Sequence, residues 1–126
     1  MLIRRSMLAV CLVAAAFPAA AQSQLYGTLK GTPAEVFDDE DRRLFGEASN
    51  KALDEAAVDE VVRWENPKTQ SHGELKVLST FEWKKAPCRK IRVSNEARGR
   101  KATNDFNFCH IGEKWKVLSP SELKKG

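Results

Sequence analysis

The residues best suited to chemistry are two cysteines, Cys88 and Cys109, and the histidine that follows the second, His110. Three interpretations are open: a structural disulfide, a pair of metal ligands, or a reactive thiol beside a histidine. A structural zinc site needs four ligands with short spacings such as C-x-x-C, whereas this chain offers only these residues and His72. On a strand, Cys109 and His110 would point to opposite faces, so the imidazole could not act as a base for the thiol. We therefore expect no metal site and favour a disulfide.

The start of the chain predicts the compartment that those thiols reach. Residues 1–21 place two arginines before an apolar run from Met7 to Phe17 and end in small residues. This is the pattern of a secretory signal peptide, with cleavage expected before Gln22. The apolar run is shorter than the about 20 residues of a spanning helix, so we expect no transmembrane segment in the mature chain. Lipid attachment at Cys11 is the disfavoured alternative, because Val10 precedes it.

Export favours the disulfide interpretation. An exported chain meets an oxidising compartment, and an even pair of cysteines in such a chain usually forms a bridge. A bridge between Cys88 and Cys109 would enclose twenty residues and stabilise the fold by about 3 kcal/mol on the chain-entropy model. We expect the mature protein to be exported, either soluble or peripherally attached to a membrane.

Charge is unevenly distributed along the chain. Residues 32–65 contain eleven acids and four bases, whereas residues 84–101 contain eight bases and one acid. Solvated faces of a helix and a sheet explain this most simply. The alternative is a basic hairpin that binds an anion or a partner, with these candidate residues: Arg89, Lys90, Arg92, Arg98, Arg100 and Lys101. Nucleic acid is not an expected partner, because export removes it and no aromatic residues interleave the basic run.

One amphipathic helix is predicted in the first half of the chain. Apolar residues recur at helical spacing over Leu44–Leu53 and the helix should end near residues 55–57. Thr32–Glu35 has the form of a capping box with proline at the first helical position, while Asp38–Asp41 could cap a later start. We expect these acids to be caps rather than acid and base catalysts.

The second half of the chain changes to the period of a strand. Val61, Val62 and Trp64 lead into a turn at Glu65–Pro67, because the residue before a proline is pushed away from helix. Alternating apolar residues then predict four strands joined by tight turns: residues 73–83, 88–94, 101–111 and 115–118. The predicted fold is α+β, with one N-terminal amphipathic helix packed on a four-stranded antiparallel β-meander. The disulfide would fix the register of two neighbouring strands across a turn at residues 95–99.

Several short motifs occur along the chain in the order that is typical of a known protein family. They are WENP (Trp64 to Pro67), Gly73, CR at Cys88–Arg89, FC at Phe108–Cys109, and a glycine with a single tryptophan in GEKWKV. Together they resemble the bacterial surface antigen domain, which is related to the C-terminal part of the rickettsial seventeen-kilodalton surface antigen. The resemblance covers roughly residues 38–118 and implies association with the outer membrane; it transfers no catalytic residue. We expect structural roles for four residues: Trp64, Asn66, Pro67 and Trp115.

These observations predict the organisation and the function. The chain divides into a signal peptide (1–21), an N-terminal segment (22–37), a surface-antigen-like domain (38–118) and a C-terminal tail (119–126). We expect a non-enzymatic exported envelope protein, without a cofactor, that is periplasmic or peripherally attached to the outer membrane. Its role would be interaction or structure, with an envelope protein or an anionic envelope component as partner. The alternative is a periplasmic binding module or inhibitor, whose basic hairpin holds an anionic ligand or an acidic protein.

Overall fold

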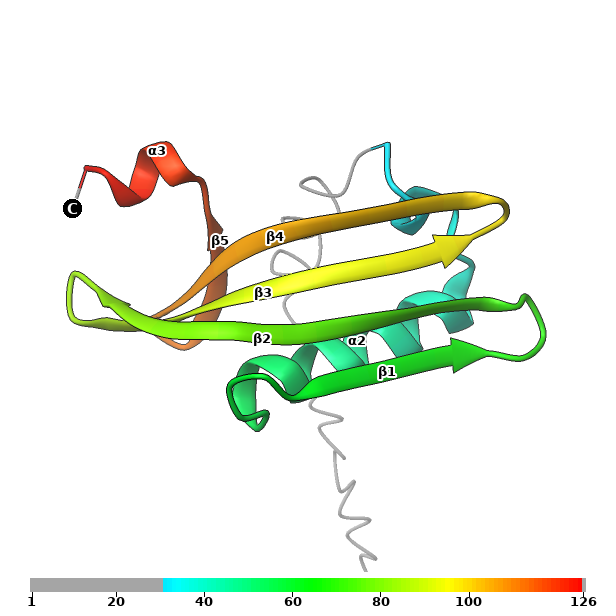
Figure 1. Cartoon of the computed structure of the whole chain (residues 1–126), viewed down its shortest axis with the longest axis horizontal. Helices are drawn as coiled ribbons and strands as arrows, with labels where there is room; N and C mark the ends of the chain where they lie inside the picture. Colours follow the sequence, from blue (N-terminus) through cyan, green and yellow to red (C-terminus); the bar gives the residue numbers. More distant parts are fainter. Residues whose placement is uncertain (1–30, 126) are drawn as a thin grey trace, which may run out of the picture.

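The computed structural model describes residues 31–125 (Figure 1). The predicted signal peptide lies outside the described residues, as does most of the predicted N-terminal segment. The elements follow in this order: the 3-10 helix η1 (Pro33–Val36), α2 (Asp39–Asp54), β1 (Val61–Asn66), β2 (Ser71–Trp83), β3 (Ala86–Ala97), β4 (Arg100–Ile111), β5 (Lys114–Leu118) and α3 (Pro120–Leu123).

The strands form one antiparallel sheet in chain order, β1-β2-β3-β4-β5. The predicted meander is therefore confirmed, but the predicted number of four strands is wrong because there are five. The additional strand is β1, which pairs with β2 from Val61 opposite Lys76 to Asn66 opposite Ser71. Its side chains alternate between buried and outward positions, as in any half-buried strand. Pro67 follows the last residue of β1, so the proline ends the strand but does not stop it from forming.

The two predicted helix starts both occur, in different elements. Asp38 caps α2: its side chain accepts from the backbone N–H of Asp41 at 2.8 Å, and the Asp41 side chain accepts from the backbone N–H of Asp38 at 3.1 Å. Thr32 precedes the short helix η1, with proline in its first turn, but the Thr32 side chain makes no cap hydrogen bond, so the capping box predicted at Thr32–Glu35 does not form. The helix α2 ends at Asp54, close to the predicted end.

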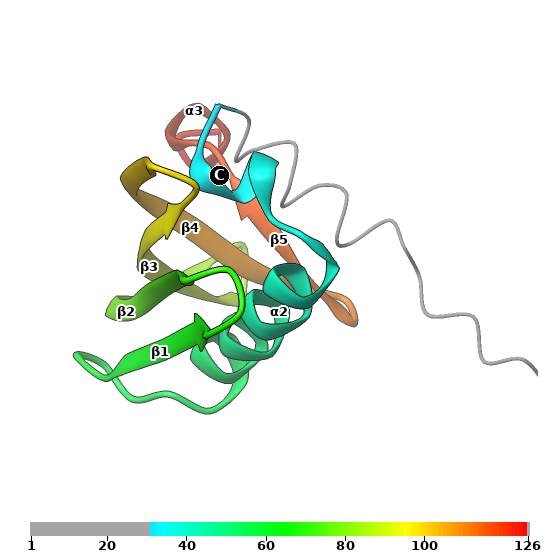
Figure 2. The ribbon, with the colours of Figure 1, turned by 90° about the vertical axis from the view of Figure 1, so that its right-hand side faces the viewer.

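The sheet curls around α2, which lies on its concave face (Figure 2). Between them is the main core, in which Phe45, Leu75, Val77 and Ile91 are almost completely buried. The helix contacts mainly β1 and β2, while η1 lies against β3 and β4. One helix and one short turn of helix thus cover the concave face.

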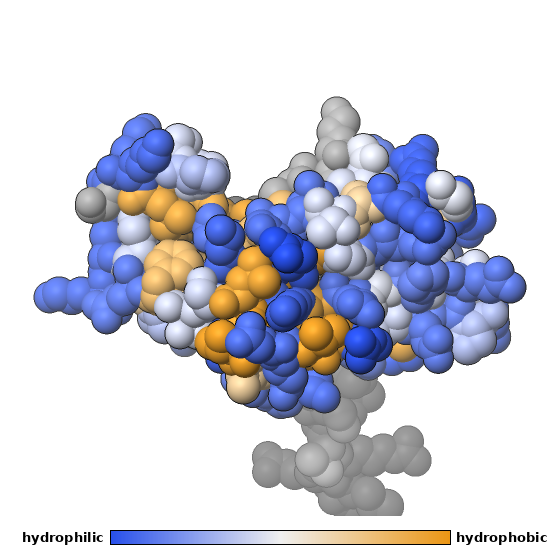
Figure 3. All heavy atoms as spheres, in the orientation of Figure 1, coloured by the Kyte–Doolittle hydropathy of each residue, from blue (hydrophilic) through white to orange (hydrophobic). Residues whose placement is uncertain are grey.

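A second, smaller core lies on the convex face of the sheet. Here Cys88, Cys109 and Leu118 are buried. Four partly buried side chains surround them: Phe81, Trp83, Ile111 and Leu123. The predicted C-terminal tail contributes to this core through α3, where the Leu123 carbonyl accepts from Trp83 Nε1 at 3.1 Å. Figure 3 shows this face, with apolar side chains toward the end where α3 lies and mainly hydrophilic side chains at the other end.

A row of three residues across β1, β2 and β3 explains one glycine. Trp64 lies opposite Gly73, which lies opposite Asn95, and Trp64 Nε1 donates to Asn95 Oδ1 at 3.1 Å over the glycine. A Cβ at Gly73 would stand 2.5 Å from Trp64 Nε1 and 2.6 Å from the Ser94 carbonyl oxygen. Only glycine therefore leaves room for the indole to cross the strand.

We predict that Gly73→Ala destabilises the protein by about 3 kcal/mol, because the methyl group overpacks the core and displaces the bond between Trp64 and Asn95. The control is Gly46→Ala in α2, where a Cβ would meet nothing within 4 Å. That change should stabilise the protein by up to about 1 kcal/mol through helix propensity. Urea unfolding measures both, and equal effects of the two changes would contradict the packing described.

Candidate functional site

The two cysteines form the predicted disulfide. Cys88 and Cys109 face each other on β3 and β4, with an S–S distance of 2.04 Å and a Cα–Cα distance of 4.0 Å. Both are buried on the convex face, and bonded sulfurs are not available as thiolates for a metal or a substrate. His110 points to the concave face, where its ring stands edge-on to Trp115 at 5.1 Å.

Arg89, the first residue of the predicted basic site, lies on the concave side of the sheet and caps α2. Its Nη1 atom donates to the carbonyl oxygen of Ala52 at 3.0 Å and to that of Ala56. The last carbonyls of a helix lack partners within the helix and carry partial negative charge. Ala52 lies in the last turn of α2 and Ala56 just after the helix, so Arg89 joins β3 to the end of α2 and to the loop that follows it.

Two further candidates lie at the tip of the β3–β4 hairpin, where they hold η1. Arg98 Nε donates to the carbonyl oxygen of Val36 at 3.1 Å. Arg100 Nη1 lies 3.4 Å from Glu35 Oε2. These contacts attach the start of the described chain to the far end of the sheet.

The remaining candidates lie on the convex face. Arg92 forms a two-pronged ion pair with Asp105, at 2.9 Å and 3.2 Å, and the hydrogen bond from Arg92 holds the pKa of Asp105 below its usual value. Lys101 Nζ is 3.6 Å from Glu96. Lys90 is exposed and forms no ion pair with a described residue. The six predicted bases are thus divided between the two faces and the hairpin tip, and most have acceptors within the molecule.

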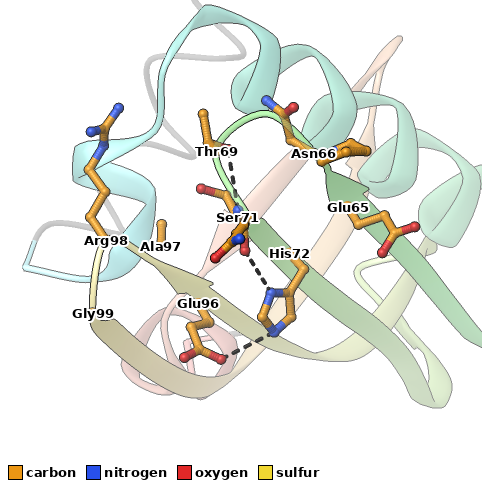
Figure 4. Close-up of a pocket in the computed structure, with 11 residues that line it drawn as sticks. Glu65, Asn66, Thr69, Ser71, His72, Glu96, Ala97, Arg98 and Gly99 are labelled. Atoms are coloured by element: carbon orange, nitrogen blue, oxygen red, sulfur yellow. Dashed lines mark hydrogen bonds and ion pairs between the residues drawn. The ribbon is translucent and has the colours of Figure 1, made fainter.

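A polar hollow of about 560 Å³ opens beside this hairpin, between it and the β1–β2 turn (Figure 4). On its wall, His72 Nε2 is 3.1 Å from Glu96 Oε2, and His72 Nδ1 is 3.0 Å from the carbonyl oxygen of Gln70. The Ser71 hydroxyl is buried and has no hydrogen-bond partner among the described residues. Ser71 and His72 are neighbours on a strand and point to opposite faces, so this histidine cannot activate this hydroxyl.

Two wall residues of the hollow, Asn66 and Thr69, are held by the buried carboxylate of Asp41. Asp41 Oδ1 accepts from Asn66 Nδ2 at 2.8 Å and from Thr69 Oγ1 at 2.7 Å. Burial raises the pKa of Asp41, but hydrogen bonds from Thr69, the Asp38 backbone and Asn66 together outweigh burial and hold that pKa below its ordinary value. The carboxylate is therefore charged at neutral pH, at the helix end where negative charge is favoured.

The four residues with expected structural roles lie at junctions between elements. Trp64 is in the main core, with its ring edge-on to Phe37 at 5.1 Å, and Asn66 belongs to the Asp41 network. Pro67 opens the β1–β2 turn. Trp115 Nε1 donates to Asp54 Oδ1 at 2.9 Å, which joins β5 to the end of α2.

The acidic residues that bind these polar and basic side chains were not predicted from the sequence, in which Asp41 and its neighbours were interpreted only as helix caps. The third helical position of a capping box is the one signal that marked Asp41. Glu35 and Asp105 carried no local signal, because their partners Arg100 and Arg92 come from other elements.

Comparison with protein-family models, with curated proteins and with solved structures found no match to this chain. The resemblance to the bacterial surface antigen domain thus stays a prediction. Within residues 31–125, no helix is long and apolar enough to cross a membrane. In the same range, no three side chains of His, Cys, Asp or Glu are grouped so as to hold a metal ion.

We predict that Arg89→Met destabilises the protein by about 2 kcal/mol, because the carbonyls of Ala52, in the last turn of α2, and of Ala56, just after it, lose their donor. Lys90→Met removes the same charge from the next residue, which is exposed, and should change stability by less than about 0.5 kcal/mol. Urea unfolding at neutral pH compares them. A loss for Lys90→Met as large as that for Arg89→Met would show that the cap is unimportant.

We predict that Asp41→Asn lowers stability at pH 7 by about 3 kcal/mol, because an amide cannot replace a charged acceptor of three hydrogen bonds. The folded pKa lies below the unfolded value of 3.8, so the stabilisation by Asp41 is complete above that value. It is lost as pH falls through the lower, folded pKa. The difference in stability between wild type and variant should therefore be constant from pH 7 to about 5 and shrink in stronger acid.

Urea unfolding over this pH range is the measurement. A difference that stayed constant into strong acid would mean that the charge of Asp41 is not what stabilises the junction.

Proposed function

We propose that the chain is a non-enzymatic, exported cell-envelope protein of the surface-antigen type. It would reside in the periplasm or be attached peripherally to the outer membrane, and act through its surface. The observation that carries the proposal is the disulfide between Cys88 and Cys109, in a chain whose first 21 residues have the pattern of a signal peptide. Disulfides form and persist in oxidising compartments, and small exported domains use them to supplement a limited core.

The contacts of the charged residues support a scaffold that presents a surface. Asp41 and Arg89 are the most strongly engaged of the charged side chains on the concave side, and both bind the ends of α2 to the sheet. The WENP motif contributes Trp64 to the core and Asn66 to the Asp41 network. The WENP residues Trp64 and Asn66 therefore have roles in the fold, which suits a domain that acts through its surface.

The alternative function, a binding module or inhibitor using the basic hairpin, has weaker support. Arg92, Arg98 and Arg100 would have to leave acceptors within the molecule to meet an anion, and Arg89 would leave the helix that it caps. Each exchange of partner reduces the free energy available for binding.

The proposal predicts that a bacterium expressing the full chain exports it. The processed protein should be recovered from the periplasmic or membrane fraction, lacking residues 1–21. Mass spectrometry should show a gain of two hydrogens on reduction, because one disulfide opens.

The control is Leu12→Arg, which places a charge in the apolar run and should leave the unprocessed chain inside the cell with its three thiols free, that of Cys11 included. An unprocessed wild-type chain with free thiols in the cytoplasm would overturn the proposal.

A further inference from the structure

Seven of the ten described lysines that form no ion pair gather at one end of the convex face. The register of the sheet forms two rows there, each running from β2 to β5: Ser79–Lys90–Asn107–Leu118 and Phe81–Cys88–Cys109–Lys116. Beyond them, Trp83 pairs with Ala86, and Ile111 pairs with Lys114. Cross-strand partners share a face, so Lys90, Lys114 and Lys116 lie on the same face as the disulfide and its apolar neighbours. The rows contain no acid. We call this surface, with α3 above it, the lysine-rimmed face.

The rim is completed by turns and by the chain end. Lys84 and Lys85 form the β2–β3 turn, and the two lysines after α3 lie at the other side. The five sheet and turn lysines are all exposed, and none of the seven forms an ion pair with a described residue. Three acids lie at the margins: Glu82, Glu113 and Glu122, of which the last is engaged in the cap of α3. Bases therefore exceed acids by four on this surface.

The turn itself gives an independent indication that the lysines matter. Lys84 and Lys85 have φ angles of 47° and 65°, the left-handed region that a two-residue hairpin requires at both positions. Asparagine and glycine adopt this conformation at lower cost than lysine. The β3–β4 turn has the same length and a glycine at one of its two positions, with φ angles of 51° at Arg98 and 80° at Gly99. Strained residues that persist at an exposed position point to a role outside the fold.

We propose that the lysine-rimmed face docks on an anionic phospholipid surface. Lysines beside a bilayer are attracted to anionic headgroups, while the partly exposed Phe81, Trp83 and Ile111 supply the apolar centre that a bilayer interface accepts. Trp83 links the apolar centre to the charged rim, because Lys84 Nζ lies 4.7 Å from the centroid of the Trp83 ring. A soluble polyanion would use the lysines but would leave the apolar centre without a partner. The proposal rests on the envelope assignment above and deepens it by naming the partner.

The opposite side of the molecule is negatively charged, which favours an orientation with the lysine-rimmed face toward the bilayer. Residues 39–60, which form α2 and the loop after it, contain eight acids and three bases, and α2 lies on the concave face, away from the rim (Figure 2). An anionic surface repels that side and attracts the other. The molecule would therefore approach a bilayer with the convex end first.

The test measures binding of the exported, processed protein to vesicles of phosphatidylcholine with about one third phosphatidylglycerol, and to vesicles of phosphatidylcholine alone. The decisive variant is Lys84→Asn with Lys85→Gly, which removes two charges and supplies the residues that the turn prefers. We expect it to unfold at an equal or higher urea concentration than wild type. It should bind the anionic vesicles about 30-fold more weakly, at roughly fivefold per lysine.

The matched control removes the same charge elsewhere, as Lys51→Gln on α2 with Lys68→Gln in the β1–β2 turn, and should bind like wild type. Brominated acyl chains should quench the fluorescence of Trp83 and leave that of the buried Trp64 unchanged, and Trp83→Phe should remove the quenching. Binding should also weaken as salt is raised.

Three results would overturn the proposal: no preference for anionic vesicles, equal binding by the turn variant, or binding to a soluble anionic polysaccharide as tight as to vesicles without quenching of Trp83. The last would identify a polyanion as the partner. If the chain is not processed, the envelope assignment fails. The vesicle test then still decides the lipid proposal, using the chain from Gln22 onward, which contains every described residue.

Discussion

The buried carboxylate of Asp41 determines how the helix meets the sheet. A buried charge is costly unless all its lone pairs are hydrogen-bonded, and the partners of Asp41 come from the end of β1 and the turn after it. One turn further along α2, Phe45 lies 6.0 Å from Trp64, two residues back along β1. Four helical residues rise about 6 Å and two strand residues about 6.6 Å. The hydrogen bonds of Asp41 and the contact between Phe45 and Trp64 can therefore form together, with α2 in one position on the sheet. The rest of the core packs around that position.

The lengths of the elements explain why a second core exists. A helix of 16 residues is about 24 Å long, whereas the 13 residues of β2 extend over about 43 Å. Beyond the bulge between Val77 and Ser79, the strands leave the helix and bend. The apolar residues past that point turn to the convex face, where the disulfide and α3 cover them. The bridge thus lies on the convex face, on the side of the sheet opposite to α2.

Much of this architecture was readable from the sequence, because periodicity and caps are local. The helix, the meander and the bridge follow from such signals, while β1 was missed because the proline after it was taken to begin a turn earlier. The extent of the β3–β4 hairpin was also underestimated, although the two cysteines carry the information. Because Cys88 and Cys109 lie directly opposite each other, the midpoint of the hairpin falls between Arg98 and Gly99. The turn therefore has two residues. The roles of the bases could not be predicted, since their acceptors come from η1, α2 and β4.

The arginines and the lysines of this molecule differ in their contacts, which the amino-acid composition alone does not reveal. Every arginine from residue 42 to residue 100 makes a hydrogen bond to a carboxylate or a backbone carbonyl, whereas Lys101 alone among the described lysines forms an ion pair. The planar guanidinium satisfies fixed acceptors with several donors, and the hydrated ammonium on its flexible stem is better left in water. Charge counted along the chain drew attention to the arginine-rich hairpin. Seven of the ten described lysines without an ion pair lie at the other end of the sheet, beside the disulfide.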